Sequence, residues 1–142
     1  MEGAMSMRAV IVTAGIGQLA LALVSLTVPR VLGWREETAK LKPLTREVFW
    51  TYAAYIWTAH ICFGLLSALA PDALLDRSLL ATVVCAFIAV WWGARLSLQV
   101  VAFDRSARPP GAIFVLAEGA LVTTFVACTG TYGYAAWMNY SG

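Results

Sequence analysis

The chain has 142 residues and a formal net charge of +2, and it contains 61% hydrophobic and 13% charged residues, with a mean hydropathy of +0.75. Soluble domains contain roughly 45–50% apolar and about 25% charged residues, and a small soluble domain cannot bury so much apolar side chain. The composition therefore excludes a soluble enzyme, a disordered tail and, with its even charge balance, a nucleic-acid-binding protein. It predicts one transmembrane domain that covers residues 1–142.

Four stretches are long and apolar enough to cross the hydrocarbon layer, which needs about 20 residues of helix. The expected spans run from about Ala9 to Val28, Phe49 to Leu69, Leu79 to Phe103 and Ala112 to Trp137. No stretch alternates apolar and polar residues as a barrel strand does. The predicted fold class is all-α: a polytopic membrane protein that forms an antiparallel bundle of four transmembrane helices.

Local signals mark the ends of these spans. Proline cannot continue a helix interior, so Pro29, Pro71 and the Pro109-Pro110 pair are expected to close or precede helices. Thr45 and Ser78 are expected to cap the second and third helices with their hydroxyl groups. Aromatic residues gather near the span ends, as in an interfacial belt. They are Trp34, Phe49, Trp50, Tyr52, Tyr55, Tyr132, Tyr134, Trp137 and Tyr140.

The distribution of lysine and arginine predicts the orientation in the membrane. The first and third loops together carry seven basic residues, which are Arg30, Arg35, Lys40, Lys42, Arg46, Arg105 and Arg108. The opposite side carries Arg8 and Arg77. We therefore expect both loops in the cytoplasm and both termini outside it, in a bacterial inner membrane or a plasma membrane. We also expect the first span to remain in place, because no A-x-A cleavage site follows it.

The first cytoplasmic loop, residues 30–46, is the longest polar segment. Apolar side chains alternate there with charged ones, so we expect a short interfacial segment that lies along the lipid headgroups. The simpler interpretation is that the basic residues of this loop only anchor it on the cytoplasmic side, as the positive-inside rule describes. The functional interpretation is a docking surface for anionic lipid or for a partner.

Two charged residues, Arg95 and Glu118, lie well inside the predicted spans. Charges at membrane depth are costly and are candidates for function. At about 1.5 Å per residue, Arg95 lies roughly 12 Å and Glu118 about 9 Å below the cytoplasmic edge, so we expect the two to pair. Gln99 follows Arg95 by one turn, and Trp91 and Trp92 precede it by one turn. These five residues are the predicted ligand-binding candidates, and a purely structural ion pair is the alternative.

Gln18 and His60 form a second predicted polar pair near the midplane of the membrane. Small residues share the face of Gln18 and allow close helix approach, so we expect Gln18 to face another helix and to hydrogen-bond to His60. A metal site is not expected, because no second histidine or aspartate lies at that depth. Cys62, Cys85 and Cys128 form no CxxC motif and are expected to act as small hydrophobic residues.

No catalytic triad, phosphate loop or pair of catalytic carboxylates is present in the sequence, so no cofactor is expected and whether the chain is an enzyme stays open. The leading hypothesis is a subunit or scaffold of a larger membrane assembly. The alternative is a membrane-embedded enzyme or binding protein for a lipid-soluble substrate, and a second alternative is an oligomeric channel or transporter. The expected partners are membrane lipid and other membrane chains or further copies of this chain, without nucleic acid.

Overall fold

The computed structural model describes residues 2–102 and 111–142, and these residues form helices without strands. Residues 103–110 lie outside the described part, and they include Arg105, Arg108 and the Pro109-Pro110 pair of the third loop. In chain order the helices are α1 (Glu2–Ser25), α2 (Val28–Val31), α3 (Trp34–Ala39), α4 (Pro43–Leu69), η1 (Pro71–Leu74), α5 (Leu79–Ser97), η2 (Leu98–Ala102) and α6 (Ala112–Ser141).

Four helical stretches are long and apolar enough to cross a membrane, as expected of an integral membrane protein. They are Ser6–Val31, Pro43–Leu69, Leu79–Ala102 and Ala112–Ser141. This finding confirms the all-α class and the presence of four apolar helices near the predicted positions. In the most apolar window of each helix, only between 11% and 28% is buried inside the chain itself, so most of this apolar surface faces outward.

Two of the predicted helix boundaries are confirmed. The Ser78 hydroxyl accepts a hydrogen bond of 3.0 Å from the backbone N–H of Ala81 and so caps α5. Pro71 follows the end of α4 at Leu69 and starts the 3-10 helix η1. A hydrogen bond from Ser78 also lowers the pKa of the exposed Asp76 carboxyl in the preceding turn.

Two other boundaries differ from the prediction. Thr45 is not a cap, because α4 already begins at Pro43; proline suits the first helical turn, where its missing N–H leaves no bond unmade. Likewise α1 ends at Ser25, and Pro29 lies in the first turn of α2. Proline therefore starts a helix at both ends of the first loop, as its fixed φ allows.

The third and fourth helices also end differently from the prediction. After Ser97 the helix continues as η2, a π-helical segment with a wider turn. The last helix, α6, runs on past Trp137 to Ser141. The helical turn that carries Gln99 is therefore not an ordinary α-helical turn.

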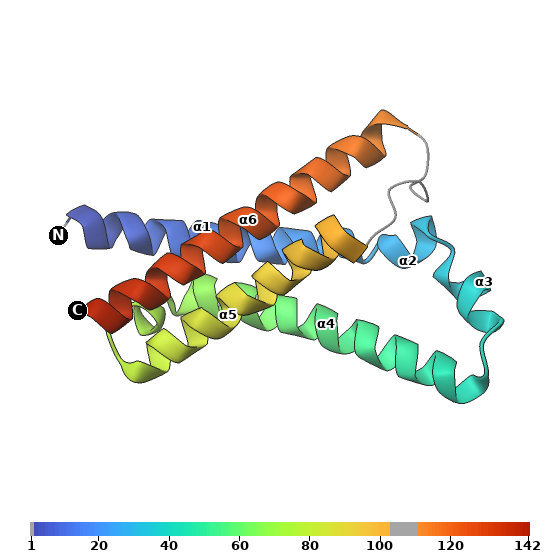
Figure 1. The fold of residues 1–142 in the computed structure, drawn as a ribbon, viewed down its shortest axis with the longest axis horizontal. Coiled ribbons are helices and arrows are strands. Elements are labelled where there is room, and N and C mark those ends of the chain that lie inside the picture. Colours follow the sequence, from blue (N-terminus) through green and yellow to red (C-terminus); the bar gives the residue numbers. More distant parts are fainter. Residues whose placement is uncertain (1, 103–110) are drawn as a thin grey trace.

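The long helices pack as two pairs, α1 with α4 and α5 with α6 (Figure 1). Gly15 and Gly64 lie where α1 and α4 approach each other closely. A Cβ atom on Gly15 would lie 2.8 Å from the Ala68 nitrogen and 2.9 Å from the Gly64 carbonyl oxygen. Only glycine permits this separation, which is typical of close helix packing in membranes.

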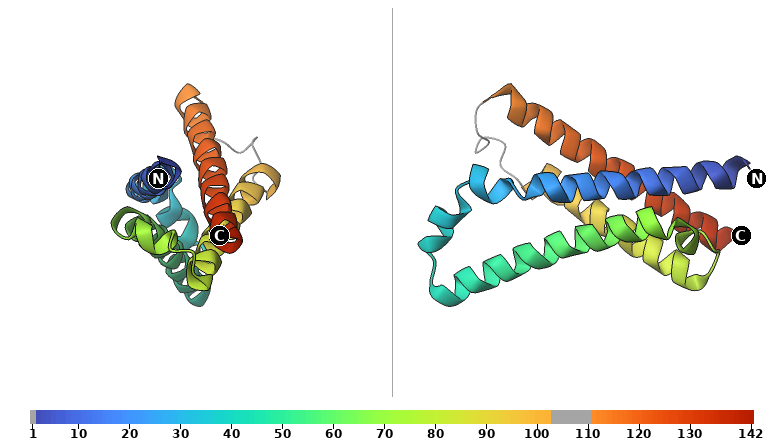
Figure 2. Two further views of the ribbon diagram at one scale, coloured as in Figure 1. Left: turned by 90° about the vertical axis from the view of Figure 1, so that its left-hand side faces the viewer. Right: turned by 180° about the vertical axis from the view of Figure 1, so that it is seen from behind.

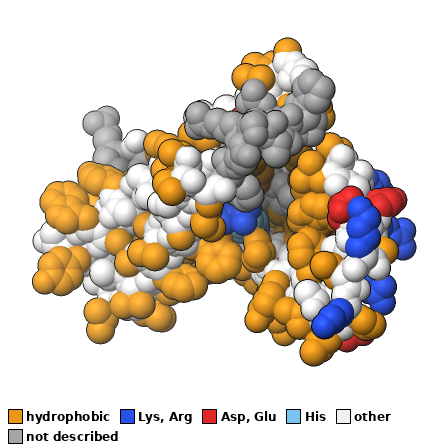
Figure 3. All heavy atoms as spheres, turned by 45° about the vertical axis from the view of Figure 1, so that its right-hand side comes forward, with side chains coloured by type: hydrophobic (Ala, Val, Ile, Leu, Met, Phe, Trp, Pro, Cys, Tyr) orange, Lys and Arg blue, Asp and Glu red, His pale blue; other side chains and the backbone are white. Residues whose placement is uncertain are grey.

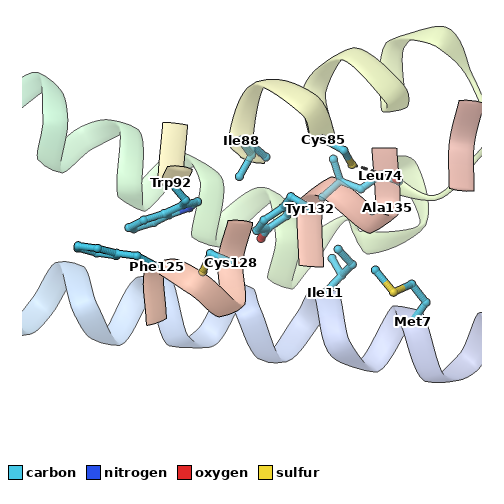
Figure 4. Packing of buried hydrophobic residues seen from close by; sticks show 10 residues of the cluster. All are labelled: Met7, Ile11, Leu74, Cys85, Ile88, Trp92, Phe125, Cys128, Tyr132 and Ala135. Carbon is cyan, nitrogen blue, oxygen red and sulfur yellow. Dashed lines mark hydrogen bonds between the residues drawn. The ribbon is translucent and has the colours of Figure 1, made fainter. Parts of the chain in front are cut away.

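The two pairs lie close together at one end and spread apart at the other (Figures 1 and 2). We call the first the closed end; it holds both termini, η1 and the last turns of α6. We call the second the open end; it holds α2, α3, η2 and the first turns of α6. The hydrophobic core lies between the two helix pairs and toward the closed end, where α1, η1, α5 and α6 meet (Figure 4).

Candidate functional site

A buried hydrogen-bond network joins all four long helices. Its members are Gln18 on α1, Ser67 on α4, Trp92 on α5 and Tyr132 on α6, and each is 0% exposed. The Gln18 amide nitrogen donates to the Tyr132 hydroxyl at 2.6 Å, and the Trp92 indole N–H donates to Gln18 Oε1 at 3.2 Å. The Ser67 and Tyr132 hydroxyls lie 2.5 Å apart and share a hydrogen bond.

This network satisfies its polar groups internally. The second amide hydrogen of Gln18 is donated to the Ala14 carbonyl at 3.2 Å, so both donors of this carboxamide are used. Buried polar groups without partners cost free energy, whereas a satisfied network fixes the register of the helices that it joins. The network therefore stabilises one arrangement of the bundle.

Next to this network, toward the open end, lies a cluster of aromatic side chains with one cation. We call it the aromatic site; it consists of His60, Trp91, Trp92, Arg95 and Phe125. The His60 ring stacks on Trp92 with centroids 4.8 Å apart, and it meets Trp91 edge to face at 6.2 Å. Phe125 packs against Trp92 at 5.4 Å, and the Arg95 guanidinium carbon lies 5.9 Å from the centroid of the Phe125 ring.

The aromatic site contains three buried nitrogen atoms that have no hydrogen-bond partner among the described residues. They are His60 Nε2, Trp91 Nε1 and Arg95 Nε. His60 is 4% exposed, so bulk solvent does not replace the missing partner. Each unpaired buried group costs about 1–3 kcal/mol, and three of them within one cluster are unusual in a folded protein.

The chemistry of these atoms restricts what can pair with them. An indole N–H and a guanidinium N–H can only donate, while an imidazole nitrogen can donate or accept. A partner must therefore supply at least two acceptors. A carboxylate or a phosphate supplies them and also neutralises the guanidinium, which cannot lose its proton at ordinary pH.

The structure brings three of the five predicted site residues into this cluster, namely Trp91, Trp92 and Arg95. Glu118 is not joined to Arg95 in an ion pair. The ion pairs between described residues are Arg8–Asp72 and Lys40–Glu37. Instead, Arg95 lies over Phe125, seven residues beyond Glu118 and so roughly 10 Å farther along α6.

The difference is one of helix register. Counting inward from the predicted span ends assumed that the third and fourth helices end at the same level. Seven residues separate Arg95 from Ala102, whereas thirteen separate Ala112 from Phe125. The first turns of α6 thus extend past the end of η2, and Glu118 lies beyond the level of Arg95.

Gln99 lies in the π-helical segment η2, where it is half-buried and makes no hydrogen bond to a described side chain. Because a π-helix has a wider turn, residue i+4 no longer falls directly over residue i. The prediction that Gln99 and Arg95 act together therefore finds no support in the contacts. π-helical turns do occur often at functional sites.

Gln18 and His60 both lie inside the bundle, as predicted, but they are not bonded to each other. Gln18 forms hydrogen bonds with Tyr132 and Trp92, while the His60 ring stacks on Trp92. Tyr132 was expected in the interfacial belt and is instead a core residue at 0% exposure. The sequence alone gives no signal for this buried position. It depends on Ser67 of α4, which comes to lie opposite Tyr132 only when the helices pack.

Among residues 2–102 and 111–142, no group of three or more His, Cys, Asp or Glu side chains is arranged to hold a metal ion. The three cysteines are free thiols, of which Cys85 and Cys128 are buried and Cys62 is exposed.

No protein-family model, curated protein or solved structure matches this chain.

Proposed function

We propose that this chain is a small integral membrane protein whose aromatic site binds the anionic head group of a lipid-soluble molecule. The observation that carries the proposal is the set of three buried nitrogens without partners, at His60, Trp91 and Arg95. Two of them can only donate hydrogen bonds and one belongs to a permanent cation. In a membrane, an anionic amphiphile is the partner with matching acceptors, charge and solubility.

The surroundings of these nitrogens suit the apolar part of such a molecule. Trp91 contacts Phe63 at 5.6 Å and Phe87 at 6.3 Å, and Phe87 is 56% exposed on the outer surface. A continuous aromatic surface therefore leads from the nitrogen atoms to the outside of the helices. Figure 3 shows Lys or Arg side-chain atoms between hydrophobic surfaces on this face of the molecule.

For the membrane arrangement, we propose an antiparallel bundle with both termini outside the cytoplasm and the open end at the cytoplasmic side. The basic residues of the first loop support this orientation. Fusions at the C-terminus test it in a bacterial host: alkaline phosphatase should be active and green fluorescent protein dark. The reverse pattern would overturn the orientation, and a chain recovered without membranes would overturn insertion.

The binding proposal is tested with the purified full-length chain in mild detergent, by native mass spectrometry. The probes are oleate, oleoyl lysophosphatidate and the neutral oleyl alcohol, which share one acyl length. We expect at least one of the two anionic probes to bind about tenfold more tightly than the alcohol, because a charge-assisted hydrogen bond contributes about 1.5–3 kcal/mol.

Two variants locate the site. Arg95→Met retains a long, unbranched side chain but removes the charge, so it should lower the preference for the anionic probe. Arg30→Met removes one exposed arginine on α2 and should leave the preference unchanged. Equal binding of all three probes to the unaltered chain, or an unchanged preference in Arg95→Met, would overturn the proposal.

The second candidate function is a subunit or scaffold of a larger membrane assembly. The observation that favours it is the small buried share of the apolar helices, which is only 11% for α6. So much outward surface can contact other membrane chains as well as lipid. Affinity purification at native expression level, followed by mass spectrometry, should return one recurring membrane partner; recovery of the chain alone would reject this candidate.

A further inference from the structure

The second feature that points to a ligand lies on the surface of the open end, apart from the aromatic site. There α3 is held against the first turns of α4 by three aromatic rings in edge-to-face contact. Trp34 lies 5.1 Å from Phe49 and 6.1 Å from Trp50, measured between ring centroids. The Trp50 indole N–H also donates to the Thr38 hydroxyl at 3.3 Å, so the two helices are fixed relative to each other.

Between these helices lies a groove of about 460 Å³, lined by Arg35, Thr38, Ala39, Arg46 and Trp50. Its volume falls in the range of small-molecule sites, roughly 300–1,000 Å³. Arg35 and Arg46 are in no ion pair with the residues that the structure describes, whereas the neighbouring Lys40 is paired with Glu37 at 2.7 Å. The groove thus offers two guanidinium groups that form no ion pair with a described residue, on helices that the aromatic contacts hold together.

We propose that this groove binds the phosphodiester head group of an anionic membrane lipid. A guanidinium presents a planar fork of N–H donors that matches two phosphate oxygens. Two such groups across one groove can hold a phosphate from both sides. Tryptophan, which lines the same groove, has an apolar ring and a polar N–H and is enriched at the depth of lipid head groups.

The position of the groove favours a lipid over a free phosphate. Arg46 and Trp50 lie near the start of α4, and this helix is one of the four stretches that are long and apolar enough to cross a membrane. A head group held between Arg35 and Arg46 would therefore lie next to a helix whose outer surface can contact acyl chains. The exposed Leu44 and Val48 lie on the other side of α4, where they line a separate groove.

This inference rests on the membrane placement proposed above, but not on the aromatic site. The test uses the full-length chain in mild detergent and native mass spectrometry, with phosphatidylglycerol and phosphatidylcholine of identical acyl chains as probes. We expect phosphatidylglycerol to bind about tenfold more tightly in the unaltered chain. In the Arg95→Met background, which removes the cation of the aromatic site, the double variant Arg35→Gln/Arg46→Gln should lose this preference.

Three controls make the result specific to the groove. Arg30→Gln/Lys42→Gln removes the same number of charges from neighbouring positions outside the groove, and it should retain the preference. Arg95→Met should retain it as well, which separates this site from the aromatic site. Soluble glycerol 3-phosphate at the same concentration as the lipid should not compete.

The proposal is overturned if both double variants lose the preference equally, because the effect would then be general surface charge. It is also overturned if phosphatidylcholine binds as tightly as phosphatidylglycerol. Displacement by glycerol 3-phosphate would reassign the groove to a soluble phosphate compound. Loss of the preference in Arg95→Met, with the groove unaltered, would mean that the aromatic site is the lipid site instead.

Discussion

The closed end and the aromatic site differ in whether their buried polar groups have hydrogen-bond partners. At the closed end, the Asn139 carboxamide donates to the Leu74 carbonyl at 2.8 Å and accepts from the backbone N–H of Arg77 at 3.2 Å. The Cys85 thiol donates to the same carbonyl at 3.4 Å. In the aromatic site, which lies next to the network on the side of the open end, three buried nitrogens lack partners among the described residues.

This difference separates a part of the molecule that maintains the fold from the part that we propose for binding. Asn139 and Ser67 tie the last helix to η1 and α4, so the helices cannot separate at the closed end without exposing unpaired groups. The aromatic site lies just beyond the last satisfied bond, which is the one between Trp92 and Gln18. A rigid support beside a set of unsatisfied donors is what a preorganised binding site requires.

The largest expected effect comes from Gly15, at the close approach of α1 and α4. Gly15→Ala should lower the free energy of unfolding by about 3 kcal/mol, because the added methyl group meets backbone atoms of α4 that have no room to move. The measurement is unfolding by sodium dodecyl sulfate in mixed micelles. The matched control is Gly17→Ala, since a Cβ atom there meets nothing within 4 Å.

The control substitution should be neutral or stabilising by about 0.5–1 kcal/mol, because alanine favours a helix more than glycine does. Equal effects at the two glycines would show that α1 and α4 do not pack as closely as the structure indicates. The position of Ser67, whose Cβ lies beside Gly15, would then also be wrong, and with it the hydrogen bond between Ser67 and Tyr132 that ties α4 to α6.

The next effect is expected at the buried network. Tyr132→Phe removes the hydroxyl that contacts Gln18 and Ser67, and it should cost about 1–3 kcal/mol of unfolding free energy because it leaves buried donors unpaired. Tyr134→Phe is the matched control, since Tyr134 is 52% exposed on the same helix. A loss below about 0.5 kcal/mol for Tyr132→Phe would contradict the role of this network.

The sequence allowed the elements to be predicted better than their contacts. Four apolar helices, the Ser78 cap and the inward position of Gln18 follow from composition, periodicity and local hydrogen bonding. Tyr132 and Asn139 could not be assigned, because their roles depend on which residues of other helices lie opposite. The sequence makes Arg95 a candidate site residue from its charge alone, and that remains a prediction. The expected pairing of Arg95 with Glu118 depended on a helix register that loop lengths do not determine.

A third prediction has the opposite sign and concerns the aromatic site. Arg95→Met should raise the free energy of unfolding of the ligand-free chain by about 1 kcal/mol, because it replaces a half-buried guanidinium, whose Nε has no hydrogen-bond partner among the described residues, with an apolar side chain of similar length. The same unfolding assay measures this, with Arg30→Met as the control. A decrease in the free energy of unfolding of more than about 2 kcal/mol would show that Arg95 stabilises the ligand-free fold, contrary to the binding proposal.

The smallest effect is expected at the ion pair between Arg8 and Asp72, which joins α1 to η1 at the closed end. The two groups lie 3.0 Å apart, but their side chains are 55% and 77% exposed. Solvent screens such a pair, and holding two mobile side chains in place costs entropy, so exposed pairs contribute roughly 0–1 kcal/mol. We expect Arg8→Gln to lower the free energy of unfolding by less than about 0.5 kcal/mol, and 0.5 M sodium chloride to remove even that difference. A loss as large as that of Tyr132→Phe would mean that surface charge, rather than Asn139 and the buried network, keeps the closed end together. The contrast between the ends would then concern electrostatics at the surface instead of satisfied and unsatisfied groups in the interior.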